Sequence, residues 1–146
     1  MEHSFILPIE VRWADLDPNF HVRHSVYYDY GAYCRVQFFA THQLSAEVLT
    51  EHHFGPILFR EECIFRREIR FDHKPTIDMH LLKARKDYSR WSIVHNINID
   101  GDTLAAVVTV DGAWIDTQKR KLIVPPDVAI QLFESMPKGE NFEWTN

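Results

Sequence analysis

The side chains best suited to chemistry lie in one short segment, residues 15–24, with the sequence DLDPNFHVRH. It contains two carboxylates, Asp15 and Asp17, and two imidazoles, His21 and His24. A carboxylate can activate a water molecule or attack a carbonyl carbon itself, and imidazole is a common acid–base group. Since proline and asparagine favour turns, the segment is predicted to be a loop that carries acid–base side chains.

A helix is predicted directly after this loop, from residue 26 to about residue 42, and Ser25 can cap it. The first backbone N–H groups of a helix lack partners and lie at the positive end of its dipole, where an oxyanion would be stabilised. Loop and helix together can therefore support acyl transfer. Apolar side chains cover most of the circumference, so other structure is expected to wrap the helix: Val26, Tyr27, Tyr30, Tyr33, Cys34, Val36, Phe38 and Phe39.

Two other interpretations of the loop stay open. Asp and Asn before a helix are commonly turn and cap residues without a catalytic role. A metal ion could also be bound by Asp15, Asp17, His21 and His24. Because no HExxH motif or cysteine pair accompanies them, we predict no metal and no cofactor.

Seven basic residues lie further along the chain. Their default interpretation is a solvated outer face, and the alternative is a patch that binds the phosphates of an anionic ligand. The sequence does not say which of them cluster: Arg66, Arg67, Arg70, Lys83, Arg85, Lys86 and Arg90.

Alternating apolar residues predict strands on both sides of the helix. Asp100-Gly101 is a hairpin-turn signal, and Pro125-Pro126-Asp127 opens a short helix that ends near Met136. The polar tail, residues 137–146, is expected to be mobile. This order predicts a single α+β domain, in which one helix is cradled by a curved, mainly antiparallel sheet. The predicted strands are residues 5–13, 57–71, 76–86, 90–99 and 103–116.

Composition narrows the function further. The chain has 146 residues and a net charge of −5, which fits one domain and argues against a nucleic-acid partner. We expect no membrane span, because no apolar stretch reaches about 18 residues. No basic segment follows Met1, so we expect no secretory signal, and the two cysteines are too few for a disulfide scaffold. A soluble, cytoplasmic protein is predicted.

Residues 12–35 resemble the hotdog-fold acyl-CoA thioesterases, in the 4-hydroxybenzoyl-CoA thioesterase-like branch that includes the Tol–Pal-associated thioesterases. The resemblance extends over roughly residues 5–135. It implies one hotdog domain over residues 1–146, with a long central helix wrapped by a curved antiparallel sheet of five to six strands. The shared pattern is an Asp-x-Asp, a turn, His-Val, a polar residue, a Tyr and a helix ending near Arg: Asp15, Asp17, His21, Val22, His24, Tyr27 and Arg35.

The resemblance also implies a reaction. An acyl-CoA thioester would be hydrolysed to a free acid and CoA, with Asp17 as nucleophile or general base. The backbone N–H of His24 would polarise the thioester carbonyl at the start of the helix. The family forms homodimers or homotetramers with sites near the subunit interface, and surface Arg and Lys bind the CoA phosphates. Substrate-binding residues are expected at Asn19, His21, Tyr27 and Arg90.

The chain departs from this family in the loop. Phe20 stands where relatives usually carry Gly before His21, and a bulky ring there could narrow or reshape the acyl pocket. Arg23 and Val26 stand where many relatives have Asn. The departures leave two rivals open: a non-catalytic protein that binds acyl-CoA or an acyl carrier protein, and a hotdog thioesterase or dehydratase directed at carrier-protein thioesters.

Overall fold

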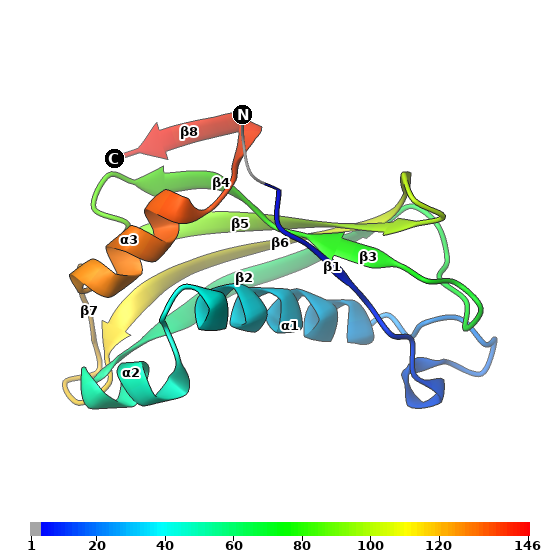
Figure 1. Ribbon diagram of the computed structural model, residues 1–146, viewed down its shortest axis with the longest axis horizontal. Helices are drawn as coiled ribbons and strands as arrows, with labels where there is room; N and C mark the ends of the chain where they lie inside the picture. The colour runs from blue at the N-terminus through cyan, green and yellow to red at the C-terminus, as the bar shows by residue number, and fades with distance from the viewer. Residues whose placement is uncertain (1–3) are drawn as a thin grey trace.

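The computed structural model describes residues 4–146, which form three α-helices, a 3-10 turn and eight strands (Figure 1). The helices are α1 (Val26–Thr41), α2 (Ala46–Glu51) and α3 (Asp127–Ser135), and the 3-10 turn η1 spans Trp13–Asp15. The strands are β1 (Ile6–Pro8), β2 (Phe54–Phe65), β3 (Thr76–Asp78), β4 (His80–Arg85), β5 (Arg90–Ile99), β6 (Thr103–Asp116), β7 (Lys121–Leu122) and β8 (Lys138–Thr145).

One curved sheet contains all of these strands. β6 pairs antiparallel with β2 on one side and with β5 on the other. β5 continues the sheet to β3 and β4, and β1 lies beyond β3. Among the described strands β2 pairs only with β6, so its other edge is free. The predicted α+β class with a mainly antiparallel sheet is confirmed.

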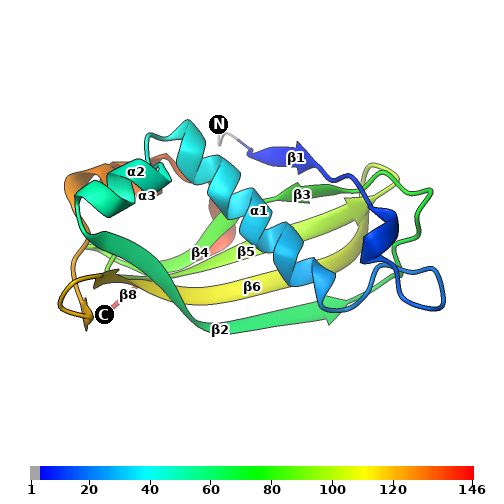
Figure 2. The ribbon, with the colours of Figure 1, turned by 90° about the horizontal axis from the view of Figure 1, so that it is seen from below.

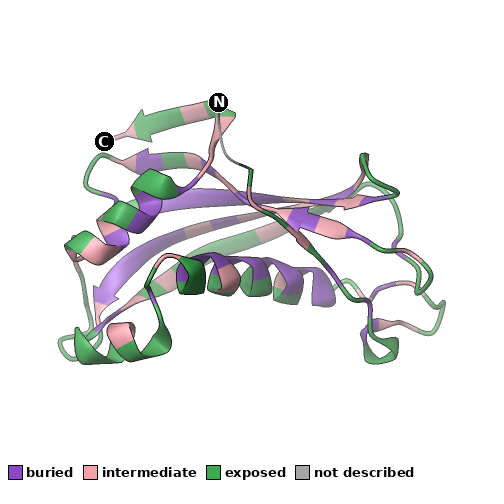
Figure 3. Ribbon diagram, viewed as in Figure 1, coloured by how far each residue is buried: buried purple, intermediate pink, exposed green. Residues whose placement is uncertain are grey.

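The long helix α1 lies along the concave face of the sheet (Figure 2). Its inner side is buried, as are most residues of β5 and β6 (Figure 3). Tyr33 and Val36 on its outer side are 47% and 60% exposed. The prediction that other structure wraps the whole helix is therefore wrong for a single chain, because the sheet curves around one side only.

No helix in residues 4–146 is long and apolar enough to cross a membrane.

An aromatic cluster closes one end of the concave face beneath α3. The ring of Trp114 lies 5.8 Å from that of Phe133, and Trp91 lies 5.5 Å from Phe133. All three side chains are buried. The core is thus continuous from α1 to α3, and it leaves the opposite end of the sheet, where α1 begins, for the loop of residues 15–24.

The sheet has eight strands rather than the predicted five to six. The predicted strand over residues 76–86 is divided into β3 and β4, and β7 adds a short strand that pairs with the end of β6. The tail expected to be mobile instead forms β8, parallel to β4. Its Phe142 and Trp144 rings pack at 4.9 Å, and Trp144 also packs on Tyr88 at 5.7 Å, which fixes the tail.

Candidate active site

Asp17 opens a tight turn in the predicted loop. The Phe20 N–H donates to the Asp17 carbonyl at 2.9 Å, which closes a β-turn over residues 17–20. The Asp17 N–H donates to the His21 carbonyl at 2.7 Å, and Leu16 and Val22 form an antiparallel bridge beside it. The loop is therefore a small hairpin with a fixed shape.

The same turn orients the Asp17 carboxylate. Its Oδ1 accepts the backbone N–H of Asn19 at 2.8 Å and that of His21 at 3.1 Å. Within residues 4–146 no donor reaches its Oδ2. One oxygen is therefore held by the backbone, and the other remains available to a water molecule or a substrate.

The N-terminus of α1 follows this hairpin. Ser25 occupies the cap position, but its side chain makes no capping bond, because its own backbone is helical, with φ −72° and ψ −22°. Its hydroxyl accepts from Arg23 Nε at 3.2 Å instead. The prediction that Ser25 caps α1 is wrong. The Val26 N–H donates to the Arg23 carbonyl at 2.9 Å, and the other N–H groups of the first turn keep their capacity to bind an anion.

Four of the six predicted site residues line one surface hollow of about 360 Å³. They come from the hairpin, from the start of α1 and from its first turn. The free carboxylate oxygen and the positive end of the helix dipole therefore meet in one place. The four are Asp17, His21, His24 and Tyr27, and the hollow is completed by Val22, Phe65, Arg66, Arg67 and Glu68.

His21 and Tyr27 are held by neighbours in this hollow. His21 Nε2 lies 3.2 Å from Glu68 Oε2. Tyr27 is buried, with its ring edge-to-face against Phe65 at 5.0 Å. Burial raises the pKa of the Tyr27 phenol to about 12. At pH 7 Tyr27 is therefore uncharged, so it lines the hollow and can donate a hydrogen bond but does not act as a base.

The other two predicted residues do not line the hollow. Asn19 is exposed at the turn and contributes through its backbone N–H. Arg90 pairs with Ala113, whereas Phe65 of the hollow pairs with Ala106, seven residues away along β6. That separation is about 24 Å. Within one chain, Arg90 therefore lies far from Asp17, and its guanidinium stacks on Phe59 at 5.1 Å.

Arg66 and Arg67 are the site residues that the sequence did not single out. Both backbone N–H groups donate to the Ala105 carbonyl, at 2.7 and 3.0 Å, so the chain turns where β2 ends. That turn brings the two arginines to the hollow. The sequence shows that the two arginines are adjacent. Only the fold, in which β2 ends just before them, distinguishes them from the other basic residues by placing them at the hollow.

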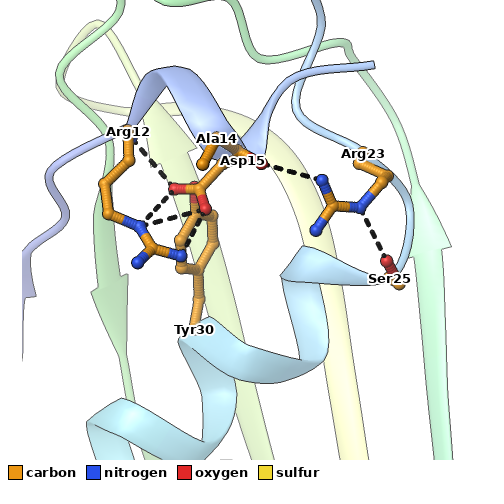
Figure 4. A network of polar contacts seen from close by, with 6 residues as sticks. All are labelled: Arg12, Ala14, Asp15, Arg23, Ser25 and Tyr30. Carbon is orange, nitrogen blue, oxygen red and sulfur yellow. Dashed lines mark hydrogen bonds and ion pairs between the residues drawn. The ribbon is translucent and has the colours of Figure 1, made fainter.

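Hydrogen bonds of Asp15 anchor the start of the hairpin to Arg12 and to Tyr30 of α1 (Figure 4). Asp15 is buried, and its oxygens accept from Arg12 Nη2 at 2.8 Å, Arg12 N at 2.9 Å and the Tyr30 hydroxyl at 3.3 Å. Burial alone would raise the pKa of Asp15, but the bonds and charge of Arg12 lower it below its ordinary value. Arg23 adds a bond to the Ala14 carbonyl at 2.8 Å.

These bonds give Asp15 a structural role. A larger hollow of about 900 Å³ lies beside it, between α1 and residues 8–12 and 71–76. The oxygens of Asp15 are already taken, so this larger hollow has no free carboxylate from Asp15. In residues 4–146 no group of three His, Cys, Asp or Glu side chains is arranged to hold a metal ion. Of the two carboxylates in the predicted loop, Asp17 is therefore the one with an oxygen open to a substrate.

Comparisons with known proteins agree with this geometry. The sequence profile of the thioesterase-like superfamily matches residues 11–132, and no curated protein sequence matches the chain. A Staphylococcus aureus protein solved in complex with CoA is 17% identical, with a TM-score of 0.84 over 94% of this chain and 89% of that chain.

Two solved enzymes are also similar in structure. A 1,4-dihydroxy-2-naphthoyl-CoA thioesterase from Synechocystis is 15% identical, with a TM-score of 0.80 over 90% of this chain and 96% of that one. A DHNA-CoA thioesterase from Staphylococcus aureus is 17% identical, with a TM-score of 0.74 over 82% and 79%. At such identities the likeness establishes the fold, and the predicted hotdog architecture is confirmed.

Proposed function

Since this chain belongs to the thioesterase-like superfamily, we propose that it hydrolyses an acyl-CoA thioester to a free acid and CoA in the hollow around Asp17. The observation that carries the proposal is a convergence. A carboxylate with one open oxygen, an uncapped helix N-terminus and two arginines line the same hollow.

Asp17 supplies the attacking group. As a general base, its Oδ2 takes a proton from water while the water oxygen bonds to the thioester carbon. As a nucleophile, the same oxygen attacks that carbon, and water then hydrolyses the mixed anhydride. In the general-base route the proton taken up by Asp17 passes to the CoA sulfur as the C–S bond breaks. In the nucleophilic route the sulfur leaves as thiolate and takes up the proton that water releases when it hydrolyses the anhydride. The oxyanion that forms on the way is stabilised by N–H groups at the start of α1, including that of His24.

Arg66 and Arg67 supply positive charge for the CoA phosphates. Guanidinium groups bind phosphate through paired, charge-assisted hydrogen bonds. Both residues are exposed at the end of β2, beside the carboxylate, where a long anionic substrate can reach them without being buried. The similar Staphylococcus aureus protein in complex with CoA supports this class of substrate.

A second copy of the chain completes the site in this proposal. The free edge of β2 exposes unpaired backbone groups, which favour pairing with another strand. Apolar side chains accompany that edge, because Ile64 is 44% exposed and Phe65 is 51% exposed. Since Phe65 also lines the hollow, a homodimer formed through β2 would extend the acyl site across the subunit interface.

Thiol release from a panel of thioesters tests the activity. Acetyl-, octanoyl-, palmitoyl- and benzoyl-CoA are compared with octanoyl thioesters of an acyl carrier protein. We expect turnover of at least one CoA ester by the wild type and none by Asp17→Asn. Asp102→Asn, a matched change at an exposed hairpin turn, keeps full activity. Binding of every ester without thiol release would refute hydrolysis and favour the acyl-binding alternative.

A further inference from the structure

Phe20 adopts a backbone conformation that large side chains rarely take. Its φ angle is +65°, in the left-handed region. It is the last residue of the turn over residues 17–20 and is followed by the Asp17–His21 backbone bond. Hairpins of this kind place a left-handed residue directly after the two central residues of the turn, which is the position of Phe20, and that residue is commonly glycine. The chain therefore carries a phenyl group where its own hairpin favours glycine.

The fold of a single chain does not offset this strain. Phe20 is 68% exposed, so its ring buries little apolar surface within the chain. Glycine at this position would relieve the left-handed conformation and remove an exposed ring. Five other non-glycine residues of the described chain, Tyr88 among them, also have positive φ angles, so it is the position of Phe20 beside Asp17 that connects its strain with function.

The turn holds Phe20 close to Asp17. Closure of a β-turn brings the Cα atoms of its first and fourth residues within about 7 Å. A carbonyl carbon attacked by the Asp17 carboxylate, or by a water on it, lies about 3 to 3.5 Å from the attacking oxygen. Phe20 is not one of the residues that line the hollow, but its exposed ring stands on the same turn as Asp17, where an acyl group that extends out of the hollow can reach it.

Resting on the proposed function, we infer that Phe20 is a specificity-determining residue whose ring contacts the acyl group of the substrate. The ring selects apolar acyl groups of several carbons over the acetyl group, because only the larger groups cover it. The left-handed backbone of Phe20 lowers the stability of the fold, and the ring at this position contributes substrate selectivity. Such a trade-off between stability and function is often found at functional sites.

Binding of two thioethers tests this inference without hydrolysis. Dissociation constants of S-octyl-CoA and S-methyl-CoA are measured by calorimetry for the wild type and for Phe20→Gly. We expect the wild type to prefer the octyl compound and Phe20→Gly to lose about tenfold of that preference. A tenfold loss is about 1.4 kcal/mol, the transfer of roughly 60 Å² of apolar surface. The melting temperature of Phe20→Gly should rise by about 3 °C.

Three further variants separate the ring from the backbone. Phe20→Asn tolerates the left-handed conformation and removes the ring, so it should lose the preference as Phe20→Gly does. Phe20→Leu keeps apolar bulk and should retain most of it. Trp13→Ala removes an aromatic side chain of η1 that is 77% exposed and should leave the preference unchanged.

Three results would overturn the inference. One is a wild type with no preference for the octyl compound. Another is a preference in Phe20→Gly and Phe20→Asn that stays within twofold of the wild type. The third is a change of oligomeric state in these two variants by size-exclusion chromatography, which would assign the ring to a subunit interface. Loss of preference in a protein that releases no thiol would support the inference and contradict the proposed hydrolysis.

Discussion

His95 should make the stability of this protein fall between pH 7.5 and pH 5. Its ring is fully buried on β5. Nδ1 lies 2.9 Å from the Asp78 carbonyl, and Nε2 lies 3.0 Å from Arg35 Nη1. Since a carbonyl and a guanidinium accept and donate respectively, Nδ1 carries the proton and Nε2 accepts. Protonation of Nε2 would break the bond to Arg35 and place two positive charges in contact.

The size of the effect follows from the pKa of His95. Burial, and then the charge of Arg35, lower it from 6.5 to about 3. Between these two values the unfolded chain binds a proton that the native state does not, so stability is complete above pH 6.5 and is lost as the pH falls toward 3. At pH 5 the loss from this residue is about 2 kcal/mol.

Chemical denaturation at pH 7.5 and pH 5 measures this loss, with His95→Gln as the matched variant. Glutamine can donate and accept in place of imidazole but does not titrate. The variant should lose about 2 kcal/mol less than the wild type over this range, because the other histidines are common to both proteins. Equal losses in the two proteins would refute the reasoning, as would an NMR titration of His95 with a midpoint above pH 5.

Three further predictions concern packing, charge and assembly. Gly112→Ala should destabilise the fold by about 3 kcal/mol in thermal denaturation, because an added Cβ would lie 2.3 Å from the Trp91 ring; an unchanged melting temperature would contradict this. Arg66→Ala combined with Arg67→Ala should raise KM for acyl-CoA about tenfold at low salt with little change in kcat, and an unchanged KM would remove these residues from CoA binding. Ile64→Lys should convert the proposed dimer to a monomer in sedimentation experiments, whereas a dimer that persists in this variant would exclude the free edge of β2 as the interface.

Local patterns predicted the central elements accurately. The predicted strands over residues 90–99 and 103–116 match β5 and β6 in their bounds, because alternation is regular there and Asp100-Gly101 marks the turn. The predicted helix differs from α1 by one residue at its end. The superfamily match confirms the predicted family and enzyme class, while the Tol–Pal branch stays a prediction.

Features that depend on contacts between distant parts of the chain could not be predicted from local sequence patterns. The sequence of the tail is mostly polar, but the packing of Phe142 and Trp144 stabilises it as strand β8 beside β4. Arg66 and Arg67 resemble the other basic residues until the end of β2 places them beside Asp17. Phe20 was recognised as unusual in the sequence, but its positive φ angle became visible only in the folded hairpin.

The most direct test of the central claim is the rate of thiol release by Asp17→Asn on the best CoA ester. The proposal predicts a fall in kcat of at least about a thousandfold, with an unchanged melting temperature and a dissociation constant for the S-octyl-CoA thioether within twofold of the wild type. A folded Asp17→Asn that retains a tenth or more of the wild-type kcat would contradict the assignment of Asp17 as the attacking or activating group.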